Sequence, residues 1–310
     1  MASETSYVCT LTPEQSDQLK SIIEDRGWTL DTIQYARWRG KHEKLSVVSY
    51  ESGKLTVQGK GTADFVQFTL EPEVLHEARF GYEKELAQIE KPKMFEPHAG
   101  IDESGKGDYF GPLVIACAYT DSKTAVNLLD AGVADSKTIS SDAKMMALDA
   151  IIRKECAGKF ALVTVGPEAY NRLYCSFGNL NRLLAWGHAK ALEELLTLVP
   201  DCPRAISDQF AQSETTVQRA LQTRGRQIVL EQHPKAEADV AVAAASILAR
   251  AEFVRFLKRI GDGIGKVLPK GGGPLVKAMA KELAAEGGYD ALERVAKLHF
   301  SITEEALGGQ

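Results

Sequence analysis

The sequence lacks the features of a membrane protein or a secreted protein. In its 310 residues no apolar run approaches the roughly 18–20 residues that a membrane-spanning helix needs. Its first ten residues, MASETSYVCT, contain neither a basic nor an apolar stretch, so we do not expect a signal peptide. The cysteines are odd in number and scattered, and without a C-x-x-C pair they predict neither a disulfide framework nor a zinc site. We therefore expect reduced, buried thiols in a cytoplasmic protein, at Cys9, Cys117, Cys156, Cys175 and Cys202.

The sequence also lacks a large excess of either charge. With a formal net charge of −5, it does not predict a protein that coats nucleic acid through bulk charge. A local basic surface is still possible in residues 27–60, where basic and aromatic residues alternate. These residues are Arg37, Arg39, Lys41, Lys44, Lys54 and Lys60, with Trp28, Tyr35, Trp38 and Tyr50. Such side chains on a sheet suit contact with a duplex backbone, and the alternative is a solvated basic face over an aromatic core.

The chain divides into three zones by pattern. Residues 1–80 begin with a helical stretch that follows Thr12, a suitable N-cap, and continue with short alternating segments, two of them joined by a turn at Gly53. This pattern predicts a small α+β domain with one curved antiparallel sheet. Residues 81–97 are charged, contain two prolines and are typical of a linker. In residues 98–310 several apolar strand-like segments are separated by helical ones, which predicts a layered α/β domain.

A glycine-rich stretch opens the third zone. Residues 100–112 read GIDESGKGDYFGP, which begins like a phosphate-binding P-loop, G-x-x-x-x-G-K, but has Gly107 where a P-loop has Ser or Thr. Asp102 and Glu103 lie inside this loop and would repel a phosphate unless a cation stood between them. A nucleotide-binding P-loop is therefore a poor match, although it remains one alternative.

Acidic residues recur where strand-like segments end. Asp102 and Glu103 lie at the end of one such segment, Asp208 follows the segment AIS, and Glu237 and Asp239 precede a helix rich in small residues. Each alone is more often a solvated carboxylate or a helix cap. Together they could meet at one edge of a sheet, where their repulsion makes sense only with a cation. Two Mg²⁺ ions about 4 Å apart would need such a cluster, and could activate water at a phosphodiester.

Six motifs in order resemble a type 2 ribonuclease H, and in particular the bacterial ribonuclease HIII branch. They are GIDESGKGDYFGPLVIACAY, VADSKTIS, AISDQFA, KAEADVAVAAASILAR, LPKGGGP and KLHF, and they extend over about 200 residues. The resemblance implies a ribonuclease H-like catalytic domain with a mixed sheet flanked by helices. The N-terminal zone, through SYESGKLTVQGK, resembles the substrate-binding extension of ribonuclease HIII, which is similar to the TATA-binding-protein fold.

The resemblance implies roles for the acidic residues. Asp102, Glu103 and Asp208 match the first three metal-binding carboxylates of the family. Glu237 in KAE matches the fourth, and Asp239 remains an alternative. The implied cofactor is a pair of Mg²⁺ ions, with Mn²⁺ as a substitute.

The resemblance also implies which residues bind the substrate. Gly105, Lys106 and Gly107 match the loop whose backbone amides contact ribose 2′-hydroxyls, the groups that distinguish RNA from DNA. Asp135, Ser136 and Lys137 either position phosphate or form a plain turn.

Four further residues have two interpretations each. Asn179 and Asn181 either contact the substrate backbone or cap a helix. Lys270 and His299 are candidates for phosphate contact or for product release, and for His299 a structural role at a helix end is the alternative.

These observations together predict an endoribonuclease that cleaves the RNA strand of an RNA–DNA hybrid and leaves 5′-phosphate and 3′-hydroxyl ends. We expect a monomer that does not associate with a membrane. The alternatives are an enzyme of the ribonuclease HII type that removes single embedded ribonucleotides, a P-loop protein, and a catalytically silent hybrid-binding module.

Overall fold

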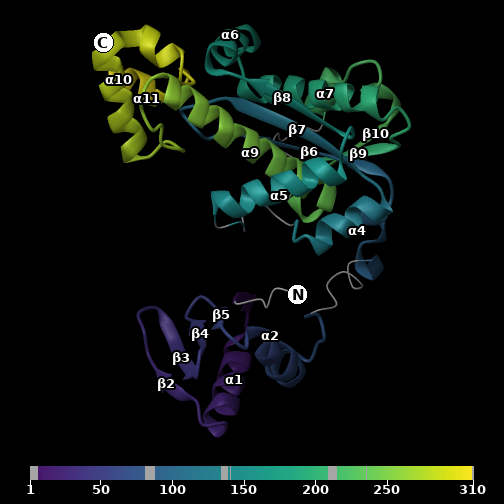
Figure 1. Ribbon diagram of the computed structural model, residues 1–310, viewed down its shortest axis with the longest axis vertical. Helices are drawn as coiled ribbons and strands as arrows, with labels where there is room; N and C mark the ends of the chain where they lie inside the picture. The colour runs from purple at the N-terminus through teal and green to yellow at the C-terminus, as the bar shows by residue number, and fades with distance from the viewer. Residues whose placement is uncertain are drawn as a thin grey trace. The chain divides into compact units, whose positions relative to one another are not determined.

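The computed structural model describes residues 6–80, 88–133, 139, 141–208, 215–234 and 236–308 (Figure 1). The chain forms two compact units, Met1–Glu90 and Lys91–Gln310. The first seven residues of the predicted linker, 81–87, lie outside the described residues, and its end contains a short 3₁₀ helix, η2 (Pro92–Phe95). Within the described part, none of the helices combines the length and the apolarity that crossing a membrane requires.

The first unit contains a five-stranded antiparallel sheet with the strand order β1-β5-β4-β3-β2. Its strands are β1 (Ser6–Thr10), β2 (Thr29–Asp31), β3 (Ala36–His42), β4 (Leu45–Tyr50) and β5 (Lys54–Gly59). Its helices are α1 (Pro13–Asp25), α2 (Thr62–Phe65) and the π-helical segment η1 (Val66–Leu75). The predicted antiparallel sheet is confirmed.

Local signals in the sequence fix the first helix and the central hairpin. Thr12 caps α1 because its Oγ1 accepts from the backbone N–H of Gln15 at 3.2 Å, while the Gln15 side chain accepts from the Thr12 N–H at 2.9 Å. Gly53, in the turn between β4 and β5, has a φ of +84°, which suits glycine best. Both predictions are confirmed.

The tryptophans of the first unit lie in its core. Trp38 is 3% exposed, and its indole N–H donates to Ser16 Oγ at 3.0 Å. The Trp28 ring lies 5.1 Å from that of Phe65 and packs against the same core. Tyr35, in contrast, is 71% exposed. For the two tryptophans, the interpretation as an aromatic core is therefore correct.

The second unit is built on a mixed sheet with the order β10-β9-β6-β7-β8. The pairs β6–β7 and β7–β8 are antiparallel. The pairs β6–β9 and β9–β10 are parallel. The strands are β6 (His98–Ser104), β7 (Leu113–Thr120), β8 (Phe160–Val165), β9 (Arg204–Asp208) and β10 (Val229–His233). The predicted mixed sheet with flanking helices is confirmed.

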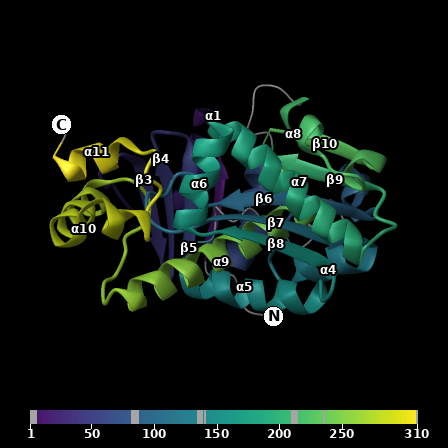
Figure 2. The same cartoon turned by 90° about the horizontal axis from the view of Figure 1, so that it is seen from above.

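Helices cover both faces of this sheet, with α7 on one face and α9 on the other (Figure 2). The helices are α4 (Ser122–Asp130), α5 (Asp142–Glu155), α6 (Pro167–Phe177), α7 (Leu180–Leu198), α8 (Thr215–Ala220), α9 (Val240–Gly263), α10 (Pro274–Glu293) and α11 (Ser301–Leu307). Two short 3₁₀ helices are η4 (Gly225–Gln227) and η5 (Ala236–Ala238).

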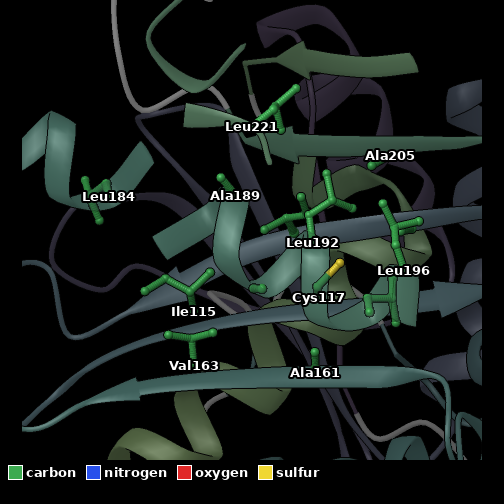
Figure 3. Close-up of a cluster of buried hydrophobic side chains, with 14 of the residues drawn as sticks. Ile115, Cys117, Ala161, Val163, Leu184, Ala189, Leu192, Leu196, Ala205 and Leu221 are labelled. Carbon is green, nitrogen blue, oxygen red and sulfur yellow. The ribbon is translucent and has the colours of Figure 1, made fainter. Parts of the chain in front are cut away.

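Alternate residues of the central strands form the core under α7. Figure 3 shows Ile115 and Cys117 of β7 and Val163 of β8 with Leu192 and Leu196 of α7. Successive strand residues point to opposite faces, so the residues between them face α9. The sheet is therefore covered on both faces. This packing holds β6 in place and sets which face each residue near its end points to.

On the other face, β6 approaches the backbone of α9 at Gly100. A Cβ built on Gly100 would lie 2.1 Å from the Val242 nitrogen and 2.2 Å from the Ala241 carbonyl carbon. No side chain of an L-residue fits there, so this glycine sets the distance between α9 and the sheet.

We expect Gly100→Ala to lower the free energy of unfolding by about 2 kcal/mol or more, because the added methyl group must push α9 from the sheet. Gly263→Ala is the matched control, since its Cβ would meet nothing within 4 Å. Urea unfolding of both variants checks this, and equal stabilities would contradict it.

Candidate active site

Three acidic residues lie near one another because the parallel strands β6 and β9 run side by side where β9 ends. Ile101 of β6 is the register partner of Ser207 of β9. Asp102 and Asp208 are the next residues along these strands, and Asp208 is the last residue of β9. Glu103 follows Asp102 on β6. The sheet therefore brings the predicted Asp102, Glu103 and Asp208 to the same edge.

Burial makes the Asp102–Glu103 pair electrostatically unfavourable. Burial and the neighbouring Glu103 charge raise the pKa of Asp102 to about 7, against the hydrogen bond from Ser246. Burial alone would also raise the pKa of Glu103, but hydrogen bonding from His188 and the charges of His188 and Lys106 outweigh it and lower that pKa. The site therefore holds two adjacent carboxyl groups, of which Glu103 ionises readily and Asp102 ionises only near neutral pH.

His188 is a site residue that the sequence analysis missed. It is fully buried on α7, with Nε2 2.9 Å from Glu103 Oε2 and Nδ1 3.0 Å from Ser207 Oγ. It therefore joins the ends of β6 and β9. The only signal in the sequence is a histidine within the apolar part of a helix, which is more often structural.

Asp239 and Glu237 have different roles in the local fold. Asp239 caps α9, and its Oδ1 accepts from the N–H groups of Ala241 at 2.8 Å and Val242 at 3.3 Å. The same oxygen lies 2.9 Å from Nε2 of the buried His98. These contacts explain Asp239 as a structural residue.

Glu237 lies in η5, next to the end of β9. Its neighbour Ala236 donates its N–H to Asp208 Oδ1 at 3.2 Å, which anchors η5 at the acidic edge. Glu237 is half-buried there. Of the two candidates for a fourth carboxylate, Asp239 is the one that caps a helix.

The glycine loop after β6 is shaped by its own backbone. Gly105 has a φ of +91°, and a Cβ there would lie 2.2 Å from the Pro112 carbonyl oxygen. Around Gly107, in contrast, a Cβ would meet nothing within 4 Å. Lys106 Nζ lies 3.6 Å from Glu103 Oε1. A P-loop opens a helix, whereas this loop joins β6 to β7, so the P-loop interpretation is wrong.

The remaining predicted substrate contacts are placed as follows. Asp135, Ser136 and Lys137 lie outside the described residues. Lys270 Nζ pairs with Asp142 Oδ2 at 2.7 Å on the surface.

The two asparagines lie at the start of α7. Asn179 is the N-cap of that helix, and its Oδ1 accepts from the N–H groups of Asn181 at 2.8 Å and Arg182 at 3.3 Å. Both asparagines line a cavity of about 590 Å³, together with Arg182, Trp186 and Arg219. The capping interpretation holds for Asn179, and Asn181 is exposed.

The donor set at the acidic edge suits a hard divalent cation. Among the described residues, no three side chains of His, Cys, Asp or Glu are already gathered at metal-binding distances. The carboxylates of Asp102, Glu103 and Asp208 are nevertheless all oxygen donors, which Mg²⁺ and Mn²⁺ prefer. The raised pKa of Asp102 marks a place where a cation would relieve repulsion. The residues present fit such an ion.

His299 lies in an aromatic cluster. Its ring stacks on Tyr174 at 4.3 Å and lies 5.5 Å from that of Tyr170. Burial, with the nearby Lys297 charge, lowers the pKa of His299 to about 4. This histidine is neutral in the folded state at neutral pH, which favours the structural interpretation.

We expect His299→Phe to weaken the acid sensitivity of folding. Between about pH 6.5 and 4 the unfolded chain takes up a proton at His299 that the folded chain refuses, so stability falls as the pH falls. Thermal unfolding at several pH values checks this. A wild-type slope in the Phe variant over that window would contradict it.

Known proteins resemble this chain over nearly its whole length. The family model Ribonuclease HII matches residues 99–303. Ribonuclease HIII of Chlamydia pneumoniae is 39% identical over 305 residues, covering 98% of this chain and 99% of the relative. Ribonuclease HIII of Chlamydia muridarum is 40% identical over 309 residues and covers 99% of both.

Solved structures agree with these relatives. The crystal structure of Bst-RNase HIII in complex with Mn²⁺ matches with a TM-score of 0.66 at 28% identity, over 98% of each chain. Aquifex aeolicus RNase H3 matches with a TM-score of 0.54 at 25% identity, over 94% of this chain and 99% of that one. The chain belongs to the ribonuclease HII family, with ribonucleases HIII as its relatives, and is a ribonuclease H. The predicted resemblance is confirmed.

Proposed function

From this family membership and the acidic sheet edge, we propose that the enzyme cleaves the RNA strand of an RNA–DNA hybrid with the help of two divalent metal ions. The products would carry 5′-phosphate and 3′-hydroxyl ends. The observation that carries this proposal is the half-buried Asp102–Glu103 pair beside Asp208, where the raised pKa of Asp102 marks a place that added positive charge would stabilise. We also expect a monomer in the cytoplasm.

Asp102, Glu103, Asp208 and Glu237 would hold the ions. Mg²⁺, with Mn²⁺ as a substitute, would supply an activated water and stabilise the leaving oxygen at the phosphodiester. The chain itself then needs no nucleophilic side chain. His188 holds Glu103 from behind at 2.9 Å, so the carboxylate keeps one orientation.

The Gly105–Gly107 loop would recognise the RNA strand. Gly105 is required by the fold, because its φ is positive and its Cβ would clash. The fold sets no such requirement at Gly107, where space is open. That opening supports a loop whose backbone approaches ribose 2′-hydroxyls.

The N-terminal unit would add affinity for the hybrid through the sheet face that its helices leave uncovered. Across β3, β4 and β5, Lys41 is aligned with Ser46 and Gln58. Lys41 and the adjacent Arg39 share one carboxylate, Asp31. At these positions the face carries polar side chains and two cations against one carboxylate, which suits binding to a phosphate backbone with little sequence preference.

We expect Asp102→Asn and Asp208→Asn each to reduce Mg²⁺-dependent cleavage of a uniform hybrid by about 100-fold or more, because each removes a metal ligand. Without metal, Asp102→Asn should be at least as stable as wild type, since it relieves repulsion with Glu103. Cleavage assays and thermal unfolding check both statements. A folded variant with full activity would contradict the proposal, because it would show that cleavage does not depend on these carboxylates.

Glu237→Gln and Asp239→Ala should separate the two candidates for the fourth carboxylate. We expect the first to stay folded but to lose activity, because it removes a metal ligand. The second should lose about 1–2 kcal/mol of stability, because α9 loses its cap, while it keeps cleavage at low temperature. The reverse pattern would assign the ligand to Asp239.

Gly107→Ala should fold with unchanged stability, because its Cβ meets open space. Its KM for the hybrid should nevertheless rise roughly 10-fold or more, since the methyl group would hold the ribose away from the backbone. Steady-state kinetics checks this, with Gly263→Ala as the control. Wild-type kinetics in the Gly107 variant would show that the loop does not approach the substrate.

A further inference from the structure

Lys297, in the KLHF motif, has a buried amine that binds the glycine loop from behind. The residue is 0% exposed. Its Nζ donates to the carbonyl oxygens of Asp108 and Gly111, both at 2.8 Å. A lysine is seldom fully buried, because taking its charge out of water is costly. The contacts of this one therefore call for an explanation beyond packing.

The backbone around Lys297 forms a short antiparallel pairing with the same loop. The Lys297 N–H donates to the Tyr109 carbonyl at 2.8 Å, and the Gly111 N–H donates to the Val295 carbonyl at 2.9 Å. Phe110 and Ala296 form a bridge between them. The side chain of Lys297 thus adds two bonds, on either side of Tyr109 and Phe110, to a pairing that the backbone begins.

The surroundings of the amine connect it to Gly105. Lys297 Nζ lies 5.7 Å from the Tyr170 ring centre and 5.9 Å from that of Phe253. Ring carbons of Phe253 come within 2.9 Å of a Cβ built on Gly105 and within 3.1 Å of one on Gly111. The ring of Phe253 therefore supports both ends of the loop, beside the amine.

The amine can hold both carbonyls in either protonation state. Burial lowers the pKa of Lys297 to about 7, against the charge of Asp108. A neutral amine still has two N–H groups, one for each carbonyl. The loop itself has a positive φ at Gly105 and at Gly111. Because glycine is conformationally free, these two ends do not fix the shape of the loop, and contacts from outside the loop must do so.

We propose that Lys297 is a positioning residue for RNA recognition: by binding the carbonyls of Asp108 and Gly111, it holds the Gly105–Gly107 backbone in the form that contacts the ribose 2′-hydroxyl. This inference depends on the proposed function of that loop. Lys297 itself touches no substrate, and acts through the backbone that it holds.

The test compares Lys297→Met, which keeps the length of the side chain but has no donor, with a matched control. Asn171 holds the same C-terminal segment from α6, since its Nδ2 donates to the Ala296 carbonyl and its Oδ1 accepts from the Leu298 N–H, both at 3.0 Å. Asn171→Leu therefore loosens the segment without touching the loop. Dissociation constants for an RNA–DNA hybrid and for a DNA duplex of the same sequence are measured in Ca²⁺, with kcat and KM in Mg²⁺.

We expect Lys297→Met to lose about 10-fold or more of the wild-type preference for the hybrid, roughly the effect of one lost hydrogen bond. KM should rise more than kcat falls, and the stabilisation of the protein by Mn²⁺ should be unchanged. Asn171→Leu should lower the melting temperature but keep the preference. A wild-type preference in Lys297→Met, or an equal loss in both variants, would overturn the inference.

Two further outcomes are decisive. If Lys297→Met does not fold, Lys297→Gln, which keeps an N–H donor, must fold with a partial loss of preference. Failure of both variants to fold would assign Lys297 to general stability and overturn the inference. If the wild-type protein itself neither prefers nor cleaves the hybrid, the proposed function is wrong. If instead the Lys297→Met variant keeps the full preference of the wild type, only the inference about Lys297 is wrong.

Discussion

Two adjacent carboxyl groups, Asp102 and Glu103, lie half-buried near the end of β6, and they repel one another. The sheet places them there because β6 is packed on both faces and because β9 ends beside it with Asp208. Nearby groups relieve the repulsion only in part: His188 reaches Glu103, and Ser246 reaches Asp102. Such an arrangement is unfavourable for a structural site and suitable for a site that binds cations.

Helix α9 organises this site along one of its faces. Asp239, Ser246 and Phe253 are seven residues apart, close to two helical turns, so they lie on the same side. The first caps the helix, the second binds Asp102, and the third supports Gly105 in the loop. The close approach of α9 to Gly100 brings all three within reach of β6. One helix thus supports both the acidic edge and the loop that we propose for RNA recognition.

Features of short range could be predicted from the sequence. The N-cap Thr12 and the turn at Gly53 depend on neighbouring residues, and the strands of the second unit are short apolar segments. The position of Asp208 at the end of β9 followed from the same pattern, whereas Asp102 lies inside β6, two residues before its end. The family itself was identified from motifs in order.

Features that depend on distant partners could not be predicted. His188 reads as an ordinary helix residue, because its partners Glu103 and Ser207 come from two other strands. The cap at Asp239 depends on where α9 begins, and the buried Lys297 has an acceptor 189 positions away in the sequence. The tryptophans Trp28 and Trp38 required the sheet to decide which side they face.

The central claim is that the acidic edge binds divalent ions in contact with the hybrid. The most direct measurement is anomalous scattering from Mn²⁺ in crystals of the protein with an RNA–DNA hybrid. The account predicts manganese peaks among Asp102, Glu103, Asp208 and Glu237, with the Gly105–Gly107 backbone against a ribose. Peaks elsewhere, or a hybrid bound with no metal at these carboxylates, would contradict it.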